Sequence, residues 1–233
     1  MPTDSQTILL VADREVPMTV RRSPRAKQIL LRIDAASGGV VLVLPRRASL
    51  AEGLRFAQSK GRWVARRLES LPPTVRFTDG AMIPILGRMR EVIWSPGASR
   101  RIDLAGGWIE SGGPSETLAD RIEAWLRRLA RAEIETRAGE MALRIGAKLG
   151  RVAIRDTSSR WGSCSSAGNL NFSWRLVLAP EWVLDYVVAH EVAHLKQMNH
   201  GKRFWRLVDG LVGDPEEARA WLRANGAGLH RYG

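Results

Sequence analysis

Residues 186–205 read YVVAHEVAHLKQMNHGKRFW and hold three of the four histidines of this 233-residue chain. His190 and His194 are four residues apart, so on an α-helix they stand on one face, about one turn from each other. His200 follows six residues later. Because two imidazoles on one helical face can hold one metal ion, the stretch predicts a metal site built on a helix.

The same stretch predicts which residues form the site. We expect His190, His194 and His200 to bind one Zn²⁺ per chain, since three protein ligands leave a fourth position for water. Zinc is inferred from the ligand type, although imidazole also binds other transition metals. Glu191 is the expected general base, which accepts a proton from zinc-activated water. The helix is predicted over 180 to about 198, with Asn199 in the left-handed conformation that returns His200 to the metal.

A polar segment before this helix supplies candidate substrate contacts. Residues 155–166 read RDTSSRWGSCSS, and from them we predict Arg160 and Ser163 as substrate or oxyanion contacts. The alternative is a turn whose serines bind its own backbone. Residues 169–178 alternate like a strand, with Asn171 and Arg175 on the polar face. We expect this strand to lie at a sheet edge and to pair with an extended substrate, the alternative being an interior strand.

The rest of the chain predicts an α+β fold in two parts. Residues 1–45 contain four strand-like runs, from which we predict a small antiparallel sheet with a turn at Asp13. A capping box, Ser49 with Glu52, opens a helix predicted over about 48–70. Short strand-like pieces then extend the sheet, and a long amphipathic helical pattern begins near Ser115 and ends near Gly150. The predicted domains are a β-rich region over 1–112 and a catalytic domain over 113–233.

Composition narrows the class of protein. The chain is 45% hydrophobic, has one cysteine and carries a formal net charge of +12. One cysteine excludes an internal disulfide framework, and a small buried thiol is the ordinary fate of Cys164. No apolar run approaches the ~20 residues that a membrane-spanning helix needs. We therefore expect a cytoplasmic protein without membrane contact, whose positive charge leaves an anionic substrate or a nucleic acid open without predicting either.

Two blocks resemble the YgjP-like zinc metallopeptidase family, which is related to SprT and to the wider zincin group. They are residues 186–205 and residues 159–180, SRWGSCSSAGNLNFSWRLVLAP; residues 21–56 are also similar. The resemblance implies a zincin-like domain with a short sheet against its helices, zinc on the three histidines and Glu191 as the base. The chain departs from the family at Gly201, where a serine is usual.

The substrate stays open at this point. A metallopeptidase is the first hypothesis. Because a member of this family is described as a nucleotide pyrophosphatase, the second is a metal-dependent nucleoside triphosphate pyrophosphatase of the UTP type, with Arg160 and Arg175 holding phosphates. The third is a nucleic-acid-associated binding protein with a structural metal site. Its predicted phosphate-binding residues are Arg21, Arg22, Arg25, Lys27, Arg46 and Arg47.

Overall fold

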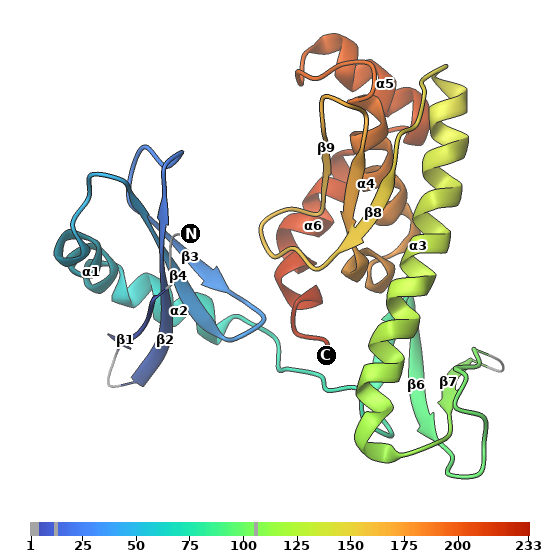
Figure 1. The fold of residues 1–233 in the computed structure, drawn as a ribbon, viewed down its shortest axis with the longest axis horizontal. Helices are drawn as coiled ribbons and strands as arrows, with labels where there is room; N and C mark the ends of the chain where they lie inside the picture. The colour runs from blue at the N-terminus through green and yellow to red at the C-terminus, as the bar shows by residue number, and fades with distance from the viewer. Residues whose placement is uncertain (1–4, 12–13, 105–106) are drawn as a thin grey trace. The chain divides into compact units, whose positions relative to one another are not determined.

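A computed structural model describes residues 5–11, 14–104 and 107–233, and its contacts divide the chain into two compact units, Met1–Pro73 and Thr74–Gly233 (Figure 1). The fold is α+β, as predicted. The division falls after Pro73 rather than after residue 112, and the turn predicted at Asp13 lies outside the described residues. The two units are described separately below.

Unit 1, Met1–Pro73, holds a four-stranded sheet. Its strands β1 (Ser5–Val11), β2 (Arg14–Ser23), β3 (Leu30–Asp34) and β4 (Gly39–Pro45) lie in the order β1-β2-β4-β3. The strands form where the sequence predicts them, but the sheet is mixed rather than antiparallel, because β2 and β4 run parallel. Strand β4 lies between β2 and β3, so these two consecutive strands are not neighbours. The antiparallel prediction was wrong here because consecutive strands usually pair with each other.

Two helices pack on one face of this sheet, α1 (Leu50–Ser59) and α2 (Gly61–Glu69). The predicted capping box is present, since the Ser49 hydroxyl accepts from the Glu52 amide and the Glu52 carboxylate accepts from the Ser49 amide. The single predicted helix is two helices that meet at Lys60. Alternate strand residues, such as Leu42 and Leu44, face the helices and form the core of the unit.

Unit 2, Thr74–Gly233, begins with a three-stranded sheet that explains the position of the division. Strands β5 (Met82–Ile85), β6 (Arg88–Trp94) and β7 (Trp108–Ser111) form a sheet of their own in the order β5-β6-β7. The prediction that these pieces extend the first sheet is therefore wrong. Their buried residues, Ile83, Val92 and Ile109, join the core of the long helix α3 (Leu118–Arg144), which follows the 3-10 turn η1 (Ser115–Thr117). Helix α3 is continuous and ends earlier than Gly150.

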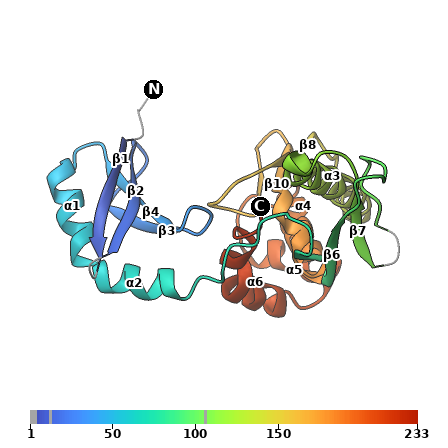
Figure 2. The same ribbon diagram turned by 90° about the horizontal axis from the view of Figure 1, so that it is seen from below.

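A second short sheet in unit 2 positions the segment before the histidine helix. It contains β8 (Val152–Arg155), β9 (Gly162–Cys164) and β10 (Leu170–Ser173) in the order β8-β10-β9. The 3-10 turn η2 (Trp174–Leu178) and helices α4 (Glu181–Ala193), α5 (Lys202–Val212) and α6 (Glu216–Leu229) complete the unit (Figure 2). The prediction that residues 169–178 form an edge strand is wrong, because β10 is the central strand and β8 and β9 are the two edges.

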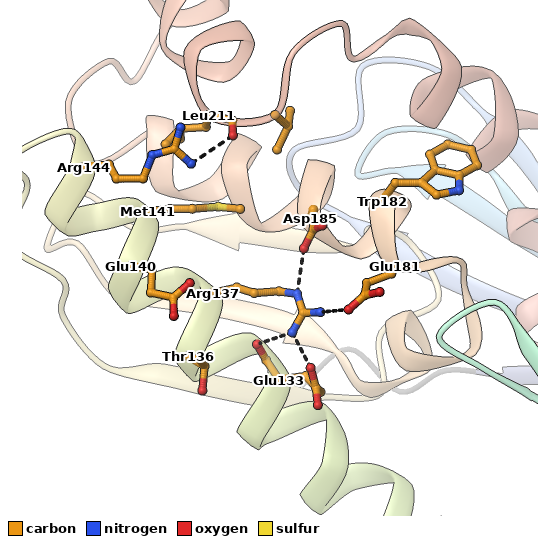
Figure 3. Close-up of a pocket in the computed structure, with 11 residues that line it drawn as sticks. Glu133, Thr136, Arg137, Glu140, Met141, Arg144, Glu181, Trp182, Asp185 and Leu211 are labelled. Carbon is orange, nitrogen blue, oxygen red and sulfur yellow. Dashed lines mark hydrogen bonds and ion pairs between the residues drawn. The ribbon is translucent and has the colours of Figure 1, made fainter. Parts of the chain in front are cut away.

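Helix α4 is fixed to α3 by an ion-pair cluster (Figure 3). The Arg137 guanidinium donates to Asp185 Oδ1 at 2.6 Å and to Glu181 Oε1 at 2.7 Å, both on α4, and it also pairs with Glu133 on its own helix. These residues line a surface pocket of about 590 Å³ together with Trp182 and the ends of α3 and α5. The pairing sets the position of α4 along α3.

None of the helices in the described part of the chain is both long and apolar enough to cross a membrane.

Candidate metal centre

Helix α4 is apolar on nearly all sides because it runs through the core of unit 2. Val183, Val188 and Val192 are fully buried, and even Glu191 is only 6% exposed. A helix that is hydrophobic all round belongs in a protein interior. Its two histidines lie near the C-terminal end, with His190 in the last turn and His194 as the C-terminal cap. The sequence therefore places both imidazoles where the helix leaves the core.

The chain turns back directly after α4. The amides of Leu195 and Lys196 donate to carbonyls three residues earlier, as in a tight 3-10 turn, so the helix ends at Ala193 rather than near residue 198. The prediction of a left-handed Asn199 is wrong, since Leu86 is the only described residue other than glycine with a positive φ. A hydrogen-bonded turn, not one strained residue, carries the chain to His200.

The turn brings the three predicted ligands together. His190, His194 and His200 each offer one ring nitrogen, and these nitrogens lie within 4.8 Å of one another. His190 Nε2 and His200 Nε2 are 3.1 Å apart. Two nitrogens bound to one tetrahedral zinc ion at ordinary bond lengths are about 3.3 Å apart. The distance between His190 Nε2 and His200 Nε2 fits a single ion of that size.

Contacts around the imidazoles fix their orientation. His194 Nδ1 lies 3.0 Å from the Gln197 carbonyl, so the proton on Nδ1 is donated there and Nε2 is left for a metal. Asp185, which lies on the same helix as His190, binds Arg137 rather than an imidazole. The buried Phe204 ring on α5 packs against all three imidazoles, with centroid distances of 4.6 to 4.9 Å. The ligands are thus held by a carbonyl and an aromatic ring.

The electrostatics of the cluster favour neutral imidazoles. Burial first, and then the charges of the neighbouring His194 and His200, lower the pKa of His190 to about 4. Burial also lowers the pKa of His194, although its bond to the Gln197 carbonyl opposes this shift. Neutral imidazoles keep a lone pair for a cation, whereas imidazolium cannot bind one. The residues present therefore fit a divalent metal.

Glu191 lies next to the histidine cluster without belonging to it. Burial raises the pKa of its carboxyl to about 7, while the positive charge of the exposed Arg160 acts in the opposite direction. A carboxyl whose pKa lies near neutrality can both accept and return a proton. Its position beside the cluster, and not within the group of converging ring nitrogens, suits a base rather than a metal ligand.

Strand β9 lies directly against this carboxyl. A Cβ atom on Gly162 would be 2.5 Å from Glu191 Cγ and 2.6 Å from its Oε1, so any larger residue there would force the Glu191 side chain to shift. Sequence reasoning missed this contact. The signal was a glycine inside a strand, which often marks a close approach of another group to the backbone.

Two predicted substrate residues are placed away from Glu191. Ser163 and Asn171 are paired across β9 and β10, so their side chains share one face of the sheet. Gly162 has Glu191 on the other face, because successive strand residues point to opposite sides. The fully buried Leu170 and Phe172 lie on that same side as Gly162 and join the unit core. Ser163 and Asn171 therefore do not face the base.

Arg175 has a different role from the predicted one. It is 8% exposed, and its guanidinium donates to Asp156 Oδ1 at 2.9 Å, to the Leu229 carbonyl at 3.1 Å and to the Tyr232 carbonyl at 2.6 Å. These contacts join the loop before β9 to the C-terminal segment. The arginine is a structural tie rather than a substrate contact.

The C-terminal segment also braces the loop that carries Arg160. His230, the fourth histidine of the chain, stacks on Trp161 with ring centroids 5.1 Å apart. A Cβ on Gly226 would be 3.1 Å from the same indole, so this glycine permits close packing of α6, which runs past it to Leu229. Burial and the charge of Glu191 both raise the pKa of Cys164, which keeps its thiol protonated, and that thiol is not among the converging ligand atoms.

The chain is similar to one family of known proteins and to one solved structure. A family model described as the YgjP-like metallopeptidase domain matches residues 27–225. A solved structure, the metallopeptidase zymogen abylysin of Pyrococcus abyssi, is similar at 22% identity and a TM-score of 0.35, over 39% of this chain and 93% of that one. No curated protein matches the chain.

Proposed function

The chain belongs to the YgjP-like metallopeptidase family, and on that premise we propose that it hydrolyses peptide bonds with one zinc ion held by His190, His194 and His200. The observation that carries the proposal is the position of Glu191, a buried carboxyl beside three converging imidazoles and in contact with an edge strand. A base, a cation site and a strand for an extended substrate are the parts that metal-dependent peptide hydrolysis requires.

The chemistry that zinc supplies is Lewis acidity, which acidifies water and polarises a carbonyl oxygen. Glu191 accepts the proton of the attacking water on its carboxylate and then returns it to the nitrogen of the leaving amine. The close approach of Gly162 limits the rotamers of Glu191, so the carboxylate keeps its orientation during both proton transfers. Arg160, which acts electrostatically on Glu191, is the remaining candidate to stabilise developing negative charge.

Strand β9 supplies the means to position a peptide. The Ser165 amide donates to the Asn169 carbonyl and the Ser173 amide to the Trp161 carbonyl, which makes Ser163 and Asn171 the hydrogen-bonded pair between them. The N–H and C=O groups of Gly162 and Cys164 therefore point away from β10, toward the outer edge of the sheet. An extended peptide paired at that edge would pass beside Glu191.

The second candidate function is hydrolysis of a nucleoside triphosphate, for which Arg160 and Arg175 were predicted to hold the phosphates. One of these two arginines has other partners. Arg175 is committed to Asp156 and to the C-terminal carbonyls. Arg160 still lies near Glu191, so a triphosphate held by one guanidinium remains as the competing reaction.

One experiment separates the two reactions. Zinc-loaded protein would be incubated with a fluorescence-quenched random peptide library and, separately, with a panel of nucleoside triphosphates, before and after chelation and zinc restoration. We expect cleaved peptides whose yield falls with the chelator and returns with zinc. Release of pyrophosphate from triphosphates without any peptide cleavage would overturn the proposal.

A further inference from the structure

Unit 1 carries a surface that peptide hydrolysis does not use. Residues 1–73 contain 13 basic and 6 acidic side chains, and no carboxylate occurs in 16–33 or 35–51. Seven basic residues fall within those two ranges. They are Arg21, Arg22, Arg25, Lys27, Arg32, Arg46 and Arg47. Charge runs of this kind are often only solvated, so their arrangement in space decides what they can bind.

The topology of the sheet gathers these residues at one end. In the parallel pair of β2 and β4, Ser23 is opposite Pro45, so both strands end together. Strand β3 begins at the same end, since Leu30 is opposite Val43. The connections 24–29 and 46–49 therefore leave the sheet side by side. They carry four exposed cations, Arg25, Lys27, Arg46 and Arg47, which we call the basic end.

The basic end is held in shape by the chain itself. Arg22 donates to the Ala48 carbonyl at 2.9 Å, with longer contacts to the carbonyls of Pro45 and Arg46, and so ties β2 to the second connection. Each connection contains a tight turn, from the Ala26 amide to the Ser23 carbonyl and from the Ala48 amide to the Pro45 carbonyl. A preorganised surface loses less conformational entropy when it binds.

The carboxylates nearest in sequence do not neutralise this end. Glu15 and Asp34 pair with Leu10 and Gly39 at the other end of the sheet. Glu52, held by the Ser49 amide and hydroxyl at 2.7 and 2.8 Å, keeps its charge, so the four cations of the basic end outnumber the one described carboxylate that follows them closely in sequence. A further cation, Arg32, lies on the sheet face that α1 and α2 do not cover, since its neighbour Leu31 faces the core.

We propose that the basic end of unit 1 binds the phosphate backbone of a nucleic acid. The cluster is almost all arginine, whose planar guanidinium matches phosphate oxygens in pairs. Its cations extend from two neighbouring connections onto the outer face of the sheet, which suits a repeating anion better than a single one. A membrane surface is less suitable, because an interfacial site needs several apolar side chains beside its charges. Among the described residues, Leu50 is the single exposed large apolar side chain that directly follows the basic connections.

The test measures the salt dependence of binding. Fluorescently labelled 20-nucleotide RNA, single-stranded DNA and duplex DNA would be titrated with the full chain between 50 and 300 mM salt. The variant Arg25→Gln/Lys27→Gln/Arg46→Gln/Arg47→Gln removes the basic end. The matched control Lys60→Gln/Arg62→Gln/Arg66→Gln/Arg67→Gln removes the same number of exposed charges from Lys60 and helix α2.

We expect the wild type and the control to bind, and the basic-end variant to lose at least tenfold in affinity at low salt. For a single strand, the slope of log affinity against log salt should fall by about 0.7 for each phosphate contact removed. Chelation of the metal should leave binding unchanged, which separates this proposal from the peptidase. Equal losses in both variants, no wild-type binding at 50 mM salt, or tighter binding to anionic lipid vesicles than to any nucleic acid would each overturn it. Unchanged far-ultraviolet circular dichroism would show that both variants fold.

Discussion

Two clusters of titratable side chains lie on different sides of helix α4, and they differ in the source of their cation. On the side toward α3, Glu181 and Asp185 bind Arg137, a cation that the chain supplies itself (Figure 3). At the C-terminal end, His190 and His194 converge with His200 on a point where none of the described residues supplies a cation. The first cluster is complete as a structural ion pair, whereas the second is complete only with an ion from outside.

Removal of a histidine ligand from the second cluster should have the largest effect on zinc content and activity. In His194→Ala we expect the bound zinc to fall from one per chain to near zero, with loss of all hydrolysis, because two imidazoles in an open site bind zinc far more weakly than three. Elemental analysis after dialysis measures the metal, and the peptide assay measures the activity. Full zinc content in this variant would show that His194 is not a ligand.

A change at Gly162 tests whether geometry limits the second cluster. In Gly162→Ala the new methyl group would displace the Glu191 side chain, and a displacement of about 1 Å costs on the order of 100-fold in rate. We expect kcat to fall by about that factor, with zinc content unchanged and KM nearly so. The control is Gly201→Ala beside His200, where a Cβ meets no atom within 4 Å. Equal kcat values for the two variants would contradict the role of Gly162.

A change at Arg137 tests the first cluster. Arg137→Ala leaves the carboxylates of Glu133, Glu181 and Asp185 close together without their cation, so we expect a loss of about 2 kcal/mol in the free energy of unfolding. The control is Arg131→Ala, whose exposed pair with Glu135 should contribute less than about 0.5 kcal/mol. Urea denaturation measures both. Equal losses would mean that the cluster does not anchor α4.

The pair of Arg175 and Asp156 should give the smallest effect. Burial opposes the charged form of Asp156, but hydrogen bonding to Arg175 and its positive charge outweigh that, so the pKa of Asp156 lies below its ordinary value. A depressed pKa in the folded state stabilises the fold above the unfolded pKa, about 3.9, and this contribution is lost as the pH falls below it. The difference in melting temperature between wild type and Asp156→Asn should therefore shrink from pH 6 to pH 3. A constant difference would contradict this account.

Features formed by residues close in sequence could be predicted, whereas contacts between distant segments could not. The spacing of His190 and His194 and the capping box of Ser49 and Glu52 are local properties of a helix, and both were read correctly. The family resemblance was confirmed by the family model. The edge position of β9, its contact with Glu191 and the parallel pairing of β2 with β4 depend on segments far apart in the sequence. No periodicity encodes them.

Arg175 is a residue whose role was predicted wrongly because its partners are distant in sequence. Its position on the polar face of a strand-like run indicated a substrate contact, but its partners, Asp156 and the carbonyls of Leu229 and Tyr232, come from 19 to 57 residues away. An arginine that satisfies distant carbonyls has the same local pattern as one that faces a ligand. Burial alone separates the two, and burial is a property of the fold.

The most direct test of the account is the zinc content and the peptide hydrolysis of Glu191→Gln, measured on one preparation beside the wild type. The amide keeps the size of the side chain but cannot accept the proton of water, so we predict one zinc per chain and a loss of about 10³-fold or more in hydrolysis. A variant that hydrolyses peptides at the wild-type rate, or one that loses its zinc, would contradict the assignment of Glu191 as the base.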